Sequence, residues 1–482
     1  MLGAWWTRLF VGSLVGRVDD ADVWWVAAAG RQMLATGAVS RENGFSFVEP
    51  EHPWIMHEWL FGPPYAWGLG ALGPRFFALV AAGALALTGA LVVAATVGRA
   101  RHLAVGCAAA LVALVLFAHP TARPTWVALA FPAAMALLAF RETLGRVAAC
   151  ACVGLELVWV NAHGSFPLGV VLLGAAAWAS GVDRRRRIVV VLAAAAVTLV
   201  NPYGLRLLAL VLDYAFAAPG HGIGDLTPIV EYAPLWDARY FSVHSAAALA
   251  VLGALVLFAV WTLVATAHRA RAVLVLALLP PAVVHARFVP TLAMVAAIVL
   301  LPALDDAVAG TRLAAHAGGP WRPRRATVGV FAGVLAGVAA VAFATVASRP
   351  TDSWIDPAVG PASFLRLVSR LPDGADVVTP FRSAGLLLWL AAPRGVRVFY
   401  DSRNDPYSAE MRRVGLTLLE RTPGDIVDEL ERRGTTHALV PSPQGVAAAS
   451  RRGYDGALGA APGWSTLARD GDWCVYARRP PP

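Results

Sequence analysis

Long apolar runs separated by short polar segments dominate the chain up to about residue 350. A helix that crosses a lipid bilayer needs about 20 mostly apolar residues, and tilted or partial spans deviate from that length. We predict spans at 2–15, 76–97, 103–118, 125–140, 147–160, 166–180, 188–200, 245–267, 272–284, 288–304 and 327–347. The first run is short and carries Arg8, so it is either a tilted or partial span or a truncated start. The pattern predicts a polytopic α-helical membrane protein with about 11 transmembrane helices.

Arginines gather in every second polar segment between these runs. Cytoplasmic loops of membrane proteins retain basic residues in this way. The arginines concerned are Arg99, Arg101, Arg141, Arg146, Arg184, Arg185, Arg186, Arg187, Arg269, Arg271, Arg312, Arg322, Arg324 and Arg325. We therefore expect the other segments outside the cytoplasm, namely 18–75, 119–124, 161–165, 201–243, 285–287 and the chain after residue 348.

The pattern changes after about residue 350, where an ordinary density of charge replaces the apolar runs. Short runs typical of strands lie at 376–379, 396–400, 438–440 and 473–477, and helix-like stretches lie at 408–420 and 424–433. Such alternation predicts a small α/β domain. We expect a transmembrane domain at 1–350, which includes the outer loop 18–75, and an extracytoplasmic domain at 351–482.

Composition supports the membrane prediction and excludes several enzyme classes. The 482 residues are 58% hydrophobic, and the net charge is +9. The basic residues lie where they set topology, so we expect no nucleic-acid partner. All 40 basic residues are arginine, which excludes a Walker A lysine, a Schiff-base lysine and a Ser-Lys dyad. The four cysteines form neither a disulfide framework nor a CxxC metal site.

The stretch "VDDADVWW" from Val18 to Trp25 places three acids beside two tryptophans. We expect Asp22 to cap a helix over 23–34 that ends at Gly37 and lies along the outer surface. Asp20 is then a candidate general base or metal ligand, and a solvated turn is the alternative. Trp24 and Trp25 are interpreted as anchors at the membrane interface.

Other polar groups on the expected outer side are candidates for binding. "PWIMHEWLFG" contains His57 and Glu58 but is no HExxH zinc motif, because position 61 is Phe. His57 can bind a metal or a phosphate, or stabilise the loop. "NAHGSF" at 161–166 and "NPYG" at 201–204 are plain turns or line a shared cavity with "HARF" at 285–288. The candidates for substrate or phosphate binding are His57, Glu58, His163, Arg206, His285, Arg287, Asp401 and Arg403.

Three charged residues of this list, Arg287, Asp401 and Arg403, suggest different roles, and Glu156 is a weaker candidate. In the tail, "FYDSRNDPY" gathers Asp401 and Arg403, which either belong to a site or form an internal pair that holds a loop. Arg287 suits a phosphate group, because a guanidinium binds its oxygens through several N–H donors. Glu156 lies inside a predicted span near its outer end and is a weaker functional candidate by the rule that charges in lipid are costly.

The layout resembles that of the GT-C superfamily of membrane glycosyltransferases. The segments "DADVWWVAAAGRQMLATGAVSRENGFSF", "PWIMHEWLFGPPYAWGLGALG" and "VFYDSRNDPY" are similar to a bacterial GT-C-like group, and distantly to oligosaccharyltransferase catalytic subunits and protein mannosyltransferase-like enzymes. The resemblance implies a polyprenyl-phosphate-linked sugar donor and a multi-pass protein of the bacterial inner membrane. It places the catalytic carboxylate at Asp20 or Asp22. "HEWL" departs from the His-Pro-Pro-Leu element of many relatives.

These residues suit an inverting glycosyl transfer outside the cytoplasm. Asp20 would take the proton of an acceptor hydroxyl, while Arg287, His285 and Arg206 would stabilise the departing lipid phosphate. A divalent cation, Mg²⁺ or Mn²⁺, held by Asp20, Asp22 and Glu58 is optional. The acceptor, whether glycan, lipid or protein, stays open. The alternatives are a transporter or lipid-linked glycan binding and assembly protein without catalysis, and a lipid-phosphate hydrolase or phosphotransferase.

Overall fold

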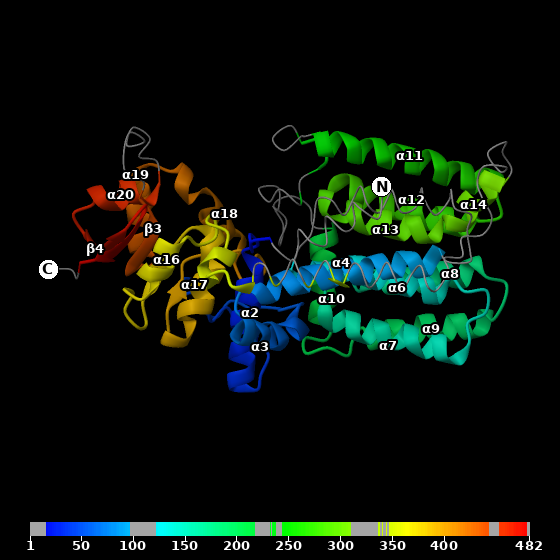
Figure 1. Ribbon diagram of the computed structural model, residues 1–482, viewed down its shortest axis with the longest axis horizontal. Coiled ribbons are helices and arrows are strands. Elements are labelled where there is room, and N and C mark those ends of the chain that lie inside the picture. The colour runs from blue at the N-terminus through cyan, green and yellow to red at the C-terminus, as the bar shows by residue number, and fades with distance from the viewer. Residues whose placement is uncertain are drawn as a thin grey trace. The chain divides into compact units, whose positions relative to one another are not determined.

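The computed structural model describes two compact units within residues 16–96, 122–216, 232, 234–237, 243–309, 336–337, 340, 344, 347–442 and 453–479. The helical unit contains Leu79–Phe216 and Leu226–Ala347, and the mixed unit contains Gly16–Ala78 and Ser348–Pro482. Figure 1 shows helices alone in the first and helices with strands in the second. The outer loop that the sequence grouped with the membrane part therefore packs with the C-terminal segment. A domain boundary at residue 350 stays a prediction.

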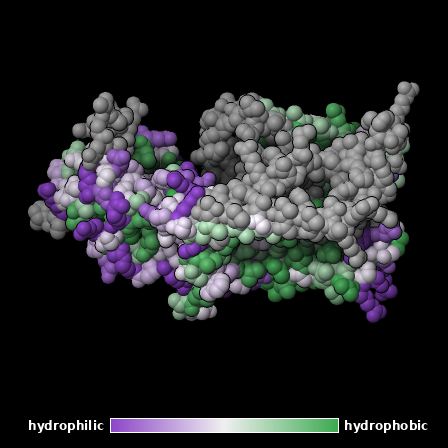
Figure 2. All heavy atoms as spheres, viewed as in Figure 1, coloured by the Kyte–Doolittle hydropathy of each residue, from purple (hydrophilic) through white to green (hydrophobic). Residues whose placement is uncertain are grey.

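The helical unit is built from apolar helices whose bounds follow most of the predicted runs. They are α4 (Arg75–Thr96, with its first four residues in the mixed unit), α6 (Val127–Ala139), α7 (Arg146–Ala162), α8 (Pro167–Ala179), α9 (Arg184–Val197), α10 (Leu205–Phe216), α11 (Val243–Ala265), α12 (Arg269–Val284), α13 (Val289–Val299) and α14 (Leu301–Ala309). Short 3-10 turns, η2 (Pro124–Trp126) and η4 (Ala286–Phe288), precede α6 and α13. Among the residues coloured in Figure 2, hydrophobic ones cover much of the lower side of this unit, and a hydrophilic patch lies at its right-hand end.

One helix among the described residues is long and apolar enough to cross a membrane, namely Arg75–Ala95 of α4. α13 and α14 meet at a bend of 56°, and the two together would count as a second membrane-spanning segment. The sequence predicted one continuous span at 288–304. Pro302 interrupts it, because proline lacks the N–H that a continuous helix needs there. The runs at 2–15 and 103–118, and most of 327–347, lie outside the described residues. The count of about 11 spans stays a prediction.

The mixed unit combines two helices of the outer loop with a five-stranded sheet. Its elements are α2 (Asp22–Thr36), η1 (Trp59–Phe61), α3 (Gly62–Leu72), η6 (Thr351–Trp354), α16 (Ala362–Val368), β1 (Asp376–Val378), α17 (Phe381–Ala391), η7 (Ala392–Arg394), β2 (Arg397–Val398), α18 (Ala409–Thr417), η8 (Leu418–Glu420), α19 (Pro423–Arg432), β3 (His437–Pro441), α20 (Tyr454–Ala460), β4 (Trp464–Asp470) and β5 (Trp473–Arg478). The strand order is β2-β1-β3-β5-β4. β1 pairs in parallel with β2 and β3, while β5 pairs antiparallel with β3 and β4.

Glycines let three helices of the mixed unit approach one another closely. A Cβ atom on Gly30 of α2 would lie 1.8 Å from the carbonyl oxygen of Gly62 in α3. A Cβ atom on Gly385 of α17 would lie 2.4 Å from the carbonyl oxygen of Ala21, directly before α2. Side chains cannot occupy such distances, so only glycine permits these crossings. The start of α2 is therefore fixed against α17, and its middle against α3.

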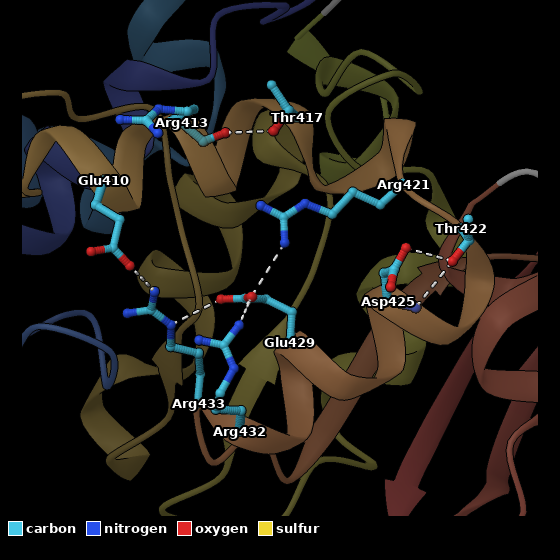
Figure 3. A network of polar contacts seen from close by, with 9 residues as sticks. All are labelled: Glu410, Arg413, Thr417, Arg421, Thr422, Asp425, Glu429, Arg432 and Arg433. Atoms are coloured by element: carbon cyan, nitrogen blue, oxygen red, sulfur yellow. Dashed lines mark hydrogen bonds and ion pairs between the residues drawn. The ribbon is translucent and has the colours of Figure 1, made fainter.

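A group of charged residues ties α19 to α18 (Figure 3). The buried carboxylate of Glu429 accepts hydrogen bonds from Arg421, Arg432 and Arg433. Arg433 also donates to Glu410 of α18 at 2.8 Å. At the start of α19 the Thr422 hydroxyl accepts the N–H of Asp425, which satisfies a backbone donor that the helix leaves unpaired. The arginines thus compensate the cost of burying one carboxylate.

Candidate functional site

Two carboxylates at the start of α2 are fixed by hydrogen bonds. An Asp20 oxygen, Oδ1, accepts the backbone N–H of Asp22 at 2.9 Å. The Asp22 Oδ1 accepts the indole N–H of Trp25 at 3.1 Å. Asp22 is the first helical residue, and Ala21 occupies the N-cap position. The prediction that Asp22 caps the helix is therefore wrong, because the Asp20 side chain reaches over the turn instead.

The expected helix after these acids is present, but its tryptophans have a different environment. α2 ends at Gly37, whose φ of 68° is the left-handed conformation that favours glycine. Trp24 is 1% exposed and contacts Phe77 edge to face. Trp25 is 7% exposed and contacts Trp54 in the same way. The interpretation of Trp24 and Trp25 as interface anchors is wrong, because both rings pack inside the protein and hold the acid-bearing turn.

His57 lies near acidic groups from both parts of the mixed unit. Its Nε2 atom is 3.6 Å from the Oε1 atom of Glu58, whose side chain is nearly buried. The Asp405 carboxylate accepts the backbone N–H of Ile55 at 3.2 Å. Burial raises the pKa of Asp405, and the positive charge of His57 opposes that shift. The structure thus brings His57, Glu58 and Asp405 together, a grouping that sequence spacing gave no means of finding.

The tail residues Asp401 and Arg403 form a completely buried ion pair. Arg403 donates to both carboxylate oxygens of Asp401, at 2.9 and 2.7 Å, and to the amide oxygen of Asn43 at 2.8 Å. Tyr407 donates to Asp401 at 2.8 Å, and the Arg403 guanidinium lies 4.5 Å from the ring centre of Trp54. Neither charged side chain is exposed. This geometry favours the alternative in which the pair holds the loop rather than binds a substrate.

Aromatic rings orient the "HARF" residues in the helical unit. The His285 Nδ1 atom is 2.7 Å from the carbonyl oxygen of Tyr232. The Arg287 guanidinium lies 4.3 Å from the ring centre of Tyr232, which stacks in turn on Tyr214. Arg206 is exposed in the first turn of α10. His285 and Arg287 therefore share one aromatic neighbour, which limits the positions that the guanidinium can adopt.

The other polar turns of the helical unit are joined by one hydrogen bond. Asn161 donates to the carbonyl oxygen of Val200, so the ends of α7 and α9 lie side by side. His163 pairs locally, with its Nδ1 atom 2.9 Å from the hydroxyl of Ser165. Glu156 is fully buried against Gly169, where a Cβ atom would lie 1.9 Å from the carboxylate. A cavity shared by the three turns stays a prediction.

The expected divalent cation stays a prediction. No group of three or more His, Cys, Asp or Glu side chains within them is placed to hold a metal ion. The Oδ1 atoms of both Asp20 and Asp22 already accept N–H hydrogen bonds. The cation at Asp20, Asp22 and Glu58 therefore gains no support from this geometry, and we derive no chemical step through it.

Comparison with known proteins finds likeness in structure alone. No family model matches the chain, and no curated protein matches its sequence. The archaeal oligosaccharyltransferase AglB from Archaeoglobus fulgidus, in complex with an inhibitory peptide and a dolichol-phosphate, matches with a TM-score of 0.54 at 12% identity, over 91% of this chain and 69% of AglB. An Archaeoglobus fulgidus oligosaccharyltransferase tethered to an acceptor peptide with the NVT sequon gives a TM-score of 0.52 at 12% identity, over 91% of this chain and 68% of that chain.

A bacterial structure gives a lower score. ArnT from Cupriavidus metallidurans bound to undecaprenyl phosphate matches with a TM-score of 0.46 at 16% identity, over 99% of this chain and 97% of ArnT. AglB and ArnT are both GT-C glycosyltransferases. The likeness to AglB spans both units, and it identifies the architecture independently of the sequence motifs. The chain shares the fold of AglB, which is a GT-C glycosyltransferase.

Proposed function

We propose that this protein is an inverting glycosyltransferase of the bacterial inner membrane. It would move a sugar from a polyprenyl-phosphate-linked donor to an acceptor outside the cytoplasm. The observation that carries the proposal is the fold likeness to AglB, a glycosyltransferase solved with a dolichol-phosphate, over 91% of this chain. The nature of the acceptor, whether glycan, lipid or protein, is left open.

Asp20 is the proposed general base. It lies at the start of α2, partly exposed, and its carboxylate is oriented by the Asp22 N–H. In the proposed step the acceptor hydroxyl gives its proton to Asp20, and its oxygen bonds to the anomeric carbon of the sugar. The bond between that carbon and the phosphate oxygen breaks, and the lipid phosphate leaves with the electron pair. Attack opposite the leaving group inverts the anomeric configuration.

We also propose that Arg287 and His285 of the helical unit bind the lipid phosphate. A guanidinium that lies over the Tyr232 ring keeps its N–H donors at the edge of the cation, where phosphate oxygens can accept them. The hydrogen bond between His285 and the Tyr232 carbonyl holds the imidazole beside the same ring. His57, Glu58 and His163 remain candidates for contact with the sugar.

Asparagine substitutions test the base without disturbing the turn. Asn has an oxygen that accepts the same N–H, so Asp20→Asn removes the charge and retains the hydrogen bond to Asp22. We expect this variant to consume a polyprenyl-phosphate sugar about 10²–10⁴-fold more slowly, the usual contribution of a general base. Purified protein in nanodiscs, incubated with a panel of such donors, gives the rate of donor loss and the mass gained by the acceptor.

Two neighbouring acids provide matched controls. Asp19 is exposed, and Asp22 binds the Trp25 indole, so Asp19→Asn and Asp22→Asn should retain most of the activity. Unchanged donor consumption by Asp20→Asn would refute the assignment of the base. Donor loss without an acceptor product would indicate a hydrolase, and binding without donor loss would favour the non-catalytic alternative.

A further inference from the structure

The helix α3 exposes an apolar surface without any charged side chain. Its sequence is "GPPYAWGLGAL", and Tyr65 is buried, with 2% of the residue exposed. Trp67 is 70% exposed and Leu72 is 38% exposed. Pro64, Gly70 and Ala71 complete the exposed face. A helix on the surface of a water-soluble protein normally carries polar residues on its solvent-facing side. The apolar exposed face of α3 therefore requires another explanation.

Aromatic contacts fix α3 to the first turn of α4. The Tyr65 ring lies 5.6 Å from the rings of both Phe76 and Phe77, measured between ring centres. A Cβ atom on Gly68 would lie 2.2 Å from the Phe76 ring, so the two helices touch there. Only Gly73 and Pro74 separate α3 from α4 in the chain. The position of α3 is therefore determined by the point at which α4 begins.

α4 begins where a spanning helix must meet the membrane surface. Arg75–Ala95 is long and apolar enough to cross a bilayer, and the end of such a helix lies at the level of the lipid headgroups. Arg75 is half-buried at this end and donates through Nε to the carbonyl oxygen of Leu72 at 2.7 Å. An arginine there can reach the lipid phosphates while its stem stays in the apolar layer. α3 consequently lies at the same level.

An open groove of about 720 Å³ continues the apolar surface within the mixed unit. Leu69, Gly70 and Pro74 form one side, next to the end of α3, and Leu386 and Leu390 of α17 contribute to the other. Apolar side chains provide most of the lining. The groove therefore offers space for a flexible hydrocarbon chain beside the exposed face of α3.

We infer that the exposed face of α3 and the adjoining groove bind the acyl chains of bilayer phospholipids. Trp67 then lies among the headgroups, the position that indole rings favour in membrane proteins. Lipid binding at this face depends on the membrane insertion of α4 and is independent of any transfer reaction. Trp67, rather than Trp24 or Trp25, is then the interface anchor of this loop.

Photocrosslinking in a defined bilayer tests this inference. Benzoylphenylalanine is incorporated in place of Trp67 in the full chain, which is reconstituted in nanodiscs of phosphatidylcholine and phosphatidylglycerol and then irradiated. We expect the intact mass to increase by that of one phospholipid. Leu467 of β4 is 51% exposed in the same unit and is the matched control. Benzoylphenylalanine at position 467 should give no lipid adduct.

Three outcomes would overturn the inference. They are the absence of a lipid adduct at position 67, a crosslink from 67 to a second protein copy, and equal lipid yields at 67 and 467. If the variant at position 67 does not fold, the same experiment at Leu72, which lies on the same face, provides the result. Thermal unfolding of each labelled protein before irradiation reports whether the fold is retained.

Discussion

The Arg403 guanidinium shows how a single residue can hold a loop. Its charge is completely buried, so it must be balanced inside the protein. Asp401 supplies the counter-charge, Asn43 accepts one further N–H, and Trp54 covers the plane of the cation. The pair therefore depends on both partners, because removal of one leaves an uncompensated buried charge.

Arg403→Met should destabilise the mixed unit by about 3–5 kcal/mol, the usual cost of breaking a buried pair. The double variant with Asp401→Leu should lose less, since it removes both charges. Chemical unfolding of the purified protein measures these differences. Arg366→Met provides a control, because its exposed pair with Asp470 should contribute little. A double variant less stable than Arg403→Met would contradict this account.

At the residue scale the sequence identified the acidic turn but assigned the wrong roles to Asp22 as a cap and to the two tryptophans. The spacing indicated a helix start near Asp22, and α2 begins there. It could not distinguish a capping side chain at position 22 from one at position 20, because Asp is typical both of an N-cap and of the turn before a helix. The tryptophans were ambiguous for a related reason: an indole favours both a protein core and a lipid interface.

At the element scale, the crossing of α2 and α3 depends on Gly30 and Gly62. Gly30→Ala should destabilise the protein, because its methyl group would lie 1.8 Å from the Gly62 carbonyl oxygen and force the helices apart. Gly70→Ala in the same α3 meets no atom within 4 Å and should be neutral or stabilising. Thermal unfolding of both variants tests the contrast, and equal losses would contradict it.

The elements were predicted best where their patterns were strong. The apolar runs gave the helices α6 to α9, α11 and α12, and the buried strands β1, β3 and β5 lie at predicted positions. β4 was missed because most of its side chains are exposed or half-buried, which leaves a weak apolar pattern. α10, a helix of 12 residues, lies within the segment 201–243 that the sequence assigned to an outer loop.

At the scale of the whole molecule, the mixed unit joins two segments that are far apart in the chain. Asn43 donates to the carbonyl oxygen of Pro406 across 363 positions of sequence. Glu49 accepts from both the N–H and the hydroxyl of Ser408. The N–H of Val398 in β2 donates to the Phe45 carbonyl at 2.9 Å. The segments around Asn43 and Pro406 were both identified in the sequence by their motifs. The periodicity of apolar residues, however, contains no information about which distant loops pair.

Asn43→Ala tests whether the two segments are stabilised together. The substitution removes hydrogen bonds to Pro406 and Arg403, so amide hydrogens of residues 398–408 should exchange faster, although they are remote in sequence. Hydrogen exchange followed by mass spectrometry measures this change. Ser40→Ala, whose side chain bonds Gln32 at the end of α2, should leave 398–408 unaffected. Acceleration confined to residues near position 43 would contradict the coupling.

The pairing of Asn43 with Pro406 also has a consequence for biosynthesis. A ribosome adds about 5–20 residues per second, so the 363 positions between them represent a delay of about 20–70 s. During that time the Asn43 segment has been made, whereas its partner strand and loop have not. Until then Phe47 lacks the Phe399 ring against which it packs, so a chaperone or the insertion machinery has an opportunity to protect it.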